Sequence, residues 1–267
     1  MKVAINSCTW GAYASFKKVP LTAEHFFTEA AVAGYAGVEI GGGEKFLGTP
    51  AACLALARRH GLEIAAYGTG VTYNPWKPNT IDYRADIDYA AELGVKTLMV
   101  CGGFMPVARR NTYGFDYDMF AGNLGALMKY AAKRGLVAAF HPHRGCIVET
   151  IEEAAQMVRR LKTISFCVDT AHLEGAGSDA LKFIRTFGKR CVYAHVKDFR
   201  WDTGAFTELG KGKSKLNVAG CVKELQKIGA TEWICVELDK NFSDKDSRTP
   251  LQSAKISRKY LKSKCNL

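Results

Sequence analysis

Four of the six histidines stand where short apolar runs end. They are His141 and His143 after GLVAAF, His172 shortly after the run that ends at Asp169, and His195 within VYAHVKD. Each run is typical of a buried strand, so these imidazoles should gather at one edge of a sheet. The runs GVEI and WICVEL bring Glu39 and Glu237 to the same edge. Imidazoles and carboxylates that converge from several strand ends form a ligand set for a divalent metal ion.

The segments around residues 169 and 195 carry the strongest candidates. In SFCVDTAHLEGAGSD, Asp169 ends a strand and His172 follows three residues later, so Asp169 is either a metal ligand or the cap of the next helix. In YAHVKDFRWD, His195 and Lys197 are two residues apart and point to the same side of a strand. Burial of a Lys is costly unless a carboxylate or a substrate oxygen pairs with it. We therefore interpret Lys197 as catalytic, with structural pairing to Asp169 or Glu237 as the alternative.

Two further segments supply acids and imidazoles. Glu237 lies in an apolar strand, where a lone carboxylate has few structural explanations, and we predict that it is functional. In FHPHRGCIVET, His141 and His143 share one side of the strand. Glu149 either folds back to the site or is a favourable acid at the N-terminus of the next helix.

Weaker candidates for substrate contact lie at other strand ends and in the loops that follow them. They are Trp10, Glu39, Tyr67, Arg144, His172, Arg200 and Lys211. Trp10 is the most ambiguous, because its ring either stacks on an apolar sugar face or covers a loop or the base of the fold.

Strand and helix signals alternate eight times along the chain. The expected helices cover residues 22–33, 50–60, 81–93, 115–133, 151–161, 179–187, 218–228 and 251–261, each after a strand-like run. Eight such units predict an α/β fold, a single (β/α)8 TIM barrel domain over residues 1–267.

The glycines support one repeated unit. Gly34, Gly61, Gly94, Gly135, Gly188 and Gly229 each fall between a helical pattern and the next strand, where a helix end favours a left-handed residue. The longer loops, 102–115 and 199–216, follow strands, and in a barrel such loops build the active face.

Composition limits the other function classes. The net charge is +11, but six Lys and Arg without an acid lie from Arg248 onward, which indicates a solvated terminal helix. We expect no nucleic-acid partner and no membrane, because no apolar run approaches a membrane span. The start MKVAINSCTW shows no signal-type segment, and four of the nine cysteines lie in strand-like runs, so we expect a cytoplasmic protein with reduced thiols. Homo-oligomerisation stays open.

The motifs HPHRGCIVET, CVDTAHLEGAGSD, YAHVKDFR, ELGKGKSKLN and WICVEL resemble the xylose isomerase-like TIM barrel superfamily of sugar isomerases, epimerases and endonuclease IV. The combination of HPHxG, VET and DTxHLxxAGxD is most similar to the inosose dehydratase branch. The resemblance implies a metal site with ligands from strands five to eight, of which the last three fall on Asp169, His195 and Glu237. Where epimerases carry Glu at the end of strand five, this chain has His141, so we assign the fourth ligand to Glu149, with His141 or His143 as alternatives.

This ligand set suits one Mn²⁺, Co²⁺ or Zn²⁺ ion, and Mg²⁺ less well. Epimerases of the family use one acid from strand five and one from strand eight on opposite faces of an enediolate. Without the strand-five Glu, His141 or His143 becomes an acid/base group beside Lys197, with Glu237 as another candidate base, and such asymmetry suits elimination. We therefore predict a dehydratase-like lyase or isomerase for a small keto-sugar or keto-cyclitol. A ketose 3-epimerase-like enzyme and a non-catalytic sugar-binding barrel are the alternatives, whereas endonuclease chemistry lacks its extra ligands, since strands three and four end in AAYGTG and MVCGGF.

Overall fold

The computed structural model describes residues 1–73, 83–105, 114–240, 242–243 and 248–267. Eight parallel strands close into a barrel in the order β1-β10-β7-β6-β5-β4-β3-β2. The strands are β1 Lys2–Asn6, β2 Gly37–Ile40, β3 Glu63–Val71, β4 Thr97–Gly102, β5 Val137–His141, β6 Ser165–Asp169, β7 Cys191–Val196 and β10 Trp233–Val236. The predicted (β/α)8 barrel is therefore confirmed.

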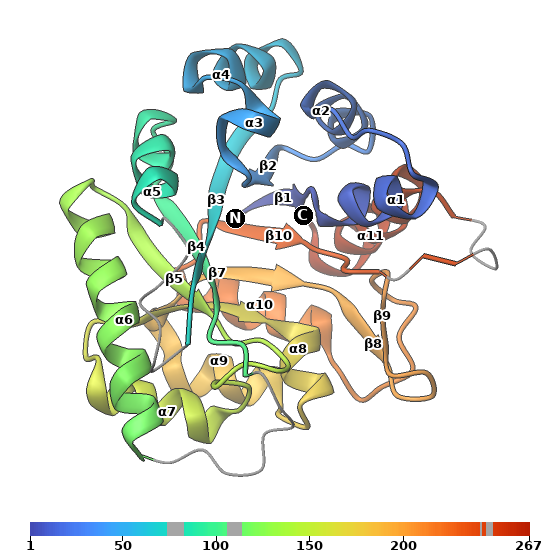
Figure 1. Ribbon diagram of the computed structural model, residues 1–267. Coiled ribbons are helices and arrows are strands. Elements are labelled where there is room, and N and C mark those ends of the chain that lie inside the picture. Colours follow the sequence, from blue (N-terminus) through green and yellow to red (C-terminus); the bar gives the residue numbers. More distant parts are fainter. Residues whose placement is uncertain (74–82, 106–113, 241, 244–247) are drawn as a thin grey trace.

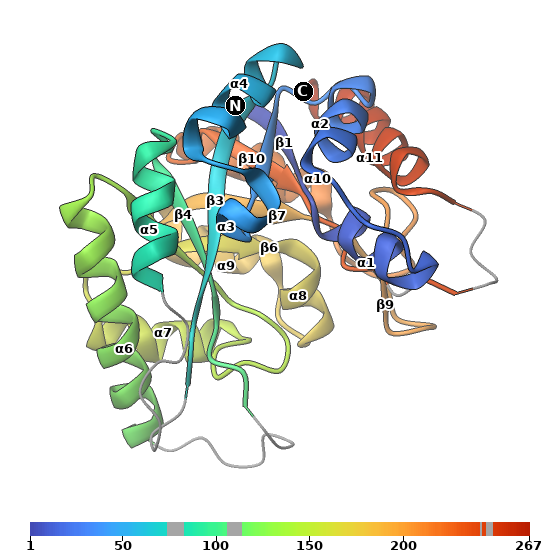
Figure 2. The same ribbon diagram turned by 45° about the horizontal axis from the view of Figure 1, so that its top comes forward.

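Helices surround the barrel on the outside, and the two views in Figures 1 and 2 show them around the strands. The helices that connect successive strands or close the chain are α2 Ala23–Val32, α4 Pro50–Arg59, α5 Tyr83–Glu92, α6 Gly114–Lys133, α7 Ile151–Arg160, α9 Ala180–Phe187, α10 Val218–Ile228 and α11 Pro250–Cys265. In the part of the chain that the structure describes, no helix is long and apolar enough to span a membrane.

Local signals set where these helices begin and end. Thr150 and Glu153 form a reciprocal capping box at the start of α7, and Thr249 forms one with Gln252 at the start of α11. All six glycines expected between a helix and the following strand have positive φ angles, from 52° at Gly188 to 84° at Gly34. The prediction that a glycine with positive φ stands between each of these helices and the next strand is thus confirmed.

Several short elements were not predicted. They are α1 Cys8–Lys17, α3 Gly43–Leu47, α8 Thr170–Gly175, the 3₁₀ helix η1 Gly188–Arg190 and the hairpin of β8 Asp198–Arg200 and β9 Ala205–Thr207. The hairpin begins at Asp198, one residue before the expected loop 199–216, and lies on the side toward which the arrows of β7 and β10 point in Figure 1. The Asp198 carboxylate accepts hydrogen bonds from the backbone N–H groups of Phe199, Gly210 and Gly212 and so fixes this loop. The other expected loop, 102–115, lies partly outside the described residues.

A layer of mostly small side chains underlies the candidate site. Its buried members are Ala4, Ala65, Ala66, Ala139, Cys167, Tyr193, Trp233 and Cys235. Four of them precede a candidate residue by two positions, namely Ala139 before His141, Cys167 before Asp169, Tyr193 before His195 and Cys235 before Glu237. Because side chains alternate along a strand, each pair points to the same side. The strands therefore raise the four candidate side chains one step above this layer.

Candidate active site

Four side chains from four strand ends meet at the carboxyl end of the barrel. The His141 Nε2 atom lies 3.3 Å from Asp169 Oδ2, and His195 Nδ1 lies 3.0 Å from Glu237 Oε2 and 3.9 Å from Asp169 Oδ2. One ligand atom from each residue lies within 4.8 Å of the other three. A Zn²⁺-type ion binds nitrogen and oxygen at roughly 2.0–2.2 Å, so ligand atoms spaced in this way can share one ion.

The orientation of His195 also fits a metal ligand. Its Nε2 atom lies 2.7 Å from Glu39 Oε2, and the other oxygen of Glu39 accepts a hydrogen bond from Asn6 Nδ2 at 2.6 Å. When Nε2 donates its proton to Glu39, the lone pair of Nδ1 faces Glu237 and Asp169. This buried Nδ1 atom has no hydrogen bond of acceptable geometry among the described residues. Two electron-rich groups tolerate such an approach when a proton or a metal ion lies between them, and an outer carboxylate that orients a ligating His is common at metal sites.

The charges around the imidazoles favour a bound cation or proton. Burial acts to lower the pKa of His195, but its contacts with Cys167, Glu237 and Glu39 raise it well above its ordinary value. Burial likewise acts to lower the pKa of His141, which its contact with Asp169 raises well above the ordinary value. Both imidazoles therefore hold a proton strongly when no metal ion is bound, and a metal ion would supply the same positive charge.

Lys197 lies against the same carboxylates. Its Nζ atom is 3.1 Å from Asp169 Oδ2, 2.5 Å from Glu237 Oε2 and 2.5 Å from Asp239 Oδ1, and its side chain is 1% exposed. Burial acts to lower the pKa of Lys197, but these three carboxylates raise it well above its ordinary value. Lys197 is thus a charged group that holds three acids, so the structure contains the pairing with Asp169 and Glu237 that was left as the alternative to catalysis.

Asp169 performs both functions considered from the sequence. Its Oδ1 atom accepts hydrogen bonds from the N–H groups of Ala171 and His172 and caps α8. Its Oδ2 atom faces His141 and Lys197. Burial acts to raise the pKa of Asp169, but Lys197 holds it well below its ordinary value. A charged carboxylate oxygen is therefore held toward the ligand group.

A second group lies beside the first and consists of His143, His172 and Asp239. The His143 and His172 rings lie 3.6 Å apart between centroids, and His172 Nε2 is 3.2 Å from Asp239 Oδ2. Burial lowers the pKa of His143 and of His172 to about 4. Both imidazoles are therefore neutral near pH 7.

The fourth ligand predicted from the sequence, Glu149, does not join the group. Its carboxylate accepts a hydrogen bond from the backbone N–H of Gly145, just before α7. His141 occupies the strand-five position of the group instead, which was one of the alternatives. The Glu149 carboxylate lies away from the ligand group because the loop between β5 and α7 folds on itself. In this loop the His143 N–H donates a hydrogen bond to the carbonyl of Val148 at 3.1 Å.

Two aromatic candidates belong to the packing of the fold and not to the site. Trp10 is buried in α1, with its indole N–H bonded to Glu29 and its ring against Phe26. Tyr67 is buried on β3, and its hydroxyl accepts the Gly43 N–H at 2.8 Å. The substrate role predicted for each is corrected to a structural one, because neither ring has a face open to a ligand.

The basic candidates lie on the loops at the mouth. The Arg144 guanidinium lies 5.6 Å from the Phe199 ring centre. Arg200 forms a two-point ion pair with Asp202 within the hairpin. Lys211 is exposed on the loop after β9. Of these three basic residues, Arg144 is the one with a described contact to the group of His143, His172 and Asp239, since its backbone N–H approaches His172 Nδ1 at 3.5 Å.

A cavity of about 480 Å³ opens beside the ligand group. Its lining includes Asn6, Glu39, Cys101 and Phe104, and the Phe104 ring contacts His143 at 5.0 Å between centroids. Sequence reasoning treated Cys101 as a buried hydrophobe, whereas it is half-buried and lines this cavity. It also missed Asn6 and Asp239. For Asp239 a signal existed, because it lies two residues after Glu237 and so continues on the same side of the chain.

The fold and the site define a parallel (β/α)8 barrel with a group of imidazoles and carboxylates at its carboxyl end that can hold a metal ion. The profile of the family described as xylose isomerase-like TIM barrel matches residues 27–264, and the chain belongs to this family. The resemblance inferred from the sequence motifs is thereby confirmed.

Relatives and solved structures extend this assignment. An inosose dehydratase of Geobacillus thermodenitrificans is 26% identical, with 92% of this chain and 91% of that protein covered. The rhizopine catabolism protein MocC of Rhizobium meliloti is also 26% identical, with 98% and 87% covered. Among solved structures, the IolI protein, whose structure holds a zinc atom, superposes with a TM-score of 0.76 at 16% identity over 98% of this chain and 97% of that one. D-psicose 3-epimerase of Clostridium cellulolyticum does so with a TM-score of 0.74 at 15% identity, over 100% and 99% of the two chains.

Proposed function

We propose that the chain is a divalent-metal-dependent enzyme for a small keto-sugar or keto-cyclitol, and that it eliminates water from its substrate. The observation that carries this proposal is the orientation of His195, whose Nδ1 atom faces Glu237 and Asp169 while Nε2 bonds to Glu39. With His141, these residues would hold the ion. A bound ion would polarise the substrate carbonyl and acidify the adjacent C–H bond. The names of the inosose dehydratase and epimerase relatives support the substrate class.

The tautomers of the second group support one base, His143. His143 Nδ1 lies 2.7 Å from the Arg144 carbonyl, which can only accept, so this nitrogen carries the proton and Nε2 keeps a free lone pair. In His172 the Nδ1 atom accepts the Arg144 N–H, so Nε2 carries the proton, near Asp239. With the pKa of each imidazole lowered to about 4, both rings keep these neutral forms near pH 7.

These roles give a balanced elimination. His143 would take the proton from the carbon next to the carbonyl at Nε2 and, as an imidazolium, would give that proton to the departing hydroxyl group, which leaves as water. His172, whose buried Nε2 atom faces Asp239, packs against the His143 ring and orients it, so the proton would leave and return on one side of the substrate. An epimerase needs groups on opposite faces, and this arrangement therefore favours elimination. Lys197 keeps Asp169, Glu237 and Asp239 in place and charged.

The test incubates keto-inositols and ketoses with the metal-loaded protein in D₂O and measures two reactions of each compound. NMR reports exchange of the proton next to the carbonyl, and ultraviolet absorbance reports the unsaturated product. The wild type should show both signals, and His143→Asn should lose both by about 10²–10⁴-fold. His172→Asn removes only the ring that orients His143 and should lower both signals together, by less than His143→Asn does. His25→Asn, an exposed histidine on α2, is the control and should behave as wild type.

Other outcomes separate the alternatives. Exchange without water loss in the wild type would replace elimination by isomerisation or epimerisation. If the metal-loaded wild type catalyses no proton exchange and no water loss with any of the keto-inositols and ketoses, the enzymatic proposal is refuted.

A further inference from the structure

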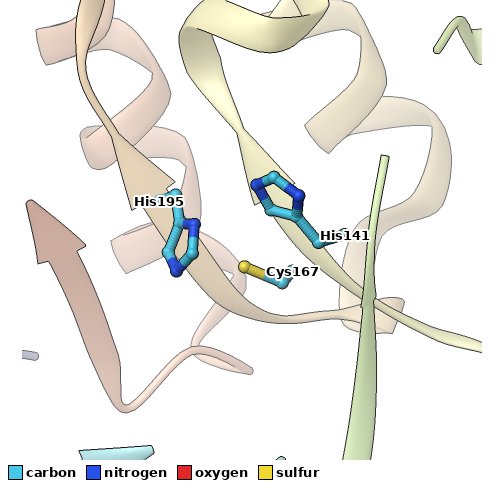
Figure 3. A group of neighbouring side chains, drawn as sticks. All are labelled: His141, Cys167 and His195. Carbon is cyan, nitrogen blue, oxygen red and sulfur yellow. The ribbon is translucent and has the colours of Figure 1, made fainter. Parts of the chain in front are cut away.

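Cys167 lies directly below the four-ligand group. It belongs to β6, two residues before Asp169, and therefore points to the same side of the strand. Its sulfur and one nitrogen from each of His141 and His195 lie within 4.8 Å of one another. Figure 3 shows the sulfur close to both imidazole rings. The two imidazoles that meet the carboxylates above thus also meet a thiol below.

The surroundings of Cys167 contain an unpartnered polar atom. Its side chain has no solvent exposure, and the layer around it consists mainly of small apolar residues such as Ala4, Ala66 and Ala139. The Nδ1 atom of His195, which faces Glu237 and Asp169, is buried without a hydrogen bond of acceptable geometry among the described residues. Buried polar atoms without partners cost free energy. A cation at this atom would give it a partner, and the Cys167 sulfur, within 4.8 Å of one nitrogen of each imidazole, is close enough to bind an ion held by the two rings.

We propose that Cys167 is a sulfur ligand of the metal centre, so that the ion bound by His141 and His195 is zinc or cobalt in preference to manganese or magnesium. This inference rests on the proposed function, because it requires an ion at the two histidines. Thiolates favour zinc and cobalt, whereas hard ions such as magnesium prefer oxygen ligands. On binding, the thiol releases its proton to solvent and the sulfur lone pair enters the coordination sphere.

The test is a titration of the metal-free protein with Co²⁺, followed by absorption spectroscopy. A cobalt–thiolate bond gives a charge-transfer band in the near ultraviolet, which imidazole and carboxylate ligands do not give. The wild type should show this band, and Cys167→Ser should lose it. The affinity for Co²⁺ and Zn²⁺ should fall in this variant by at least the roughly 10–100-fold that an outer partner contributes, with a smaller loss for Mn²⁺.

Two further variants guard the interpretation. Cys221→Ser changes an equally buried cysteine on α10 and should keep both the band and the affinity. Cys167→Ala fits the alanine-rich layer and replaces the serine variant if that one unfolds.

The outcomes separate this inference from the proposed function. If the wild type binds Co²⁺ without the band, and Cys167→Ser binds it equally well, the sulfur ligand is refuted while the imidazole–carboxylate centre stands. If the wild type binds no metal ion at all, the metal-dependent function fails, and the sulfur ligand fails with it.

Discussion

Replacing Lys197 with methionine should destabilise the protein, and the loss should depend on pH. Methionine matches the length of the side chain but removes the charge that contacts Asp169, Glu237 and Asp239. Removal of one partner from a buried ion pair costs about 3–5 kcal/mol. The Asp239 side chain is 34% exposed, so water screens part of the remaining repulsion. We therefore expect the lower end, about 3 kcal/mol at pH 7.

The pH dependence follows from the pKa shifts of the carboxylates. Burial acts to raise the pKa of all three acids, but Lys197 holds the pKa of Asp169 and of Asp239 below their ordinary values, and His195 together with Lys197 does the same for Glu237. A carboxylate with a lowered folded-state pKa stabilises the fold above its unfolded pKa, about 4, and this contribution is lost as the pH falls. In the variant the three acids repel one another, their pKa values rise, and protonation relieves the repulsion. The difference in stability between wild type and variant should therefore be largest near pH 7 and should narrow toward pH 4.

Thermal and urea unfolding between pH 4 and pH 8 would measure this difference. A loss of about 3 kcal/mol corresponds to a fall in Tm of roughly 6–12 °C for a domain near this size. Lys2→Met is the matched control, because Lys2 pairs with Glu63 on the surface, where an ion pair contributes about 0–1 kcal/mol. Saturating Zn²⁺ should restore part of the stability of Lys197→Met. A loss below about 1 kcal/mol that does not change with pH would refute the reasoning.

Three further substitutions test other parts of the structure. Glu39→Gln should weaken metal binding by about 10–100-fold in a competition with a chelating dye, and unchanged affinity would remove the orienting role of this acid. Gly102→Ala should cost about 1–3 kcal/mol or more in urea unfolding, because φ is 148° and a Cβ would overlap the Val71 carbonyl oxygen. Gly94→Ala is its control, with a positive φ but no atom within 4 Å, and an equal loss in both would argue against the overlap. Asp198→Ala should speed proteolytic cleavage in the following loop, since it frees three backbone N–H groups, and an unchanged cleavage rate would contradict this.

The barrel was predictable because its signals are local and repeated. Alternating apolar runs and glycine-terminated helices recur along the chain, and closure of the sheet follows from their number. The helix Cys8–Lys17 escaped prediction because its residues combine a glycine near the first turn, Gly11, with a weak apolar face. The strands of the hairpin are three residues each, too short to show a periodic pattern.

The site was predictable to the extent that strands alone position it. Asp169, His195 and Glu237 come together because the carboxyl ends of parallel strands meet at one face of a barrel. The choice between Glu149 and His141 depended on the path of a loop, which no periodic pattern records. The sequence left Trp10 open between substrate contact and packing, because its neighbour Glu29, which accepts the indole N–H, comes from a different helix.

The metal content of the purified protein, measured by elemental analysis beside Glu237→Gln, tests the central claim most directly. We predict about one zinc, cobalt or manganese ion per chain in the wild type and its loss in Glu237→Gln. Glu63→Gln, which changes a surface acid, should retain the ion. Absence of metal from the wild type, with no uptake on reconstitution, would contradict a metal centre at His141, Asp169, His195 and Glu237.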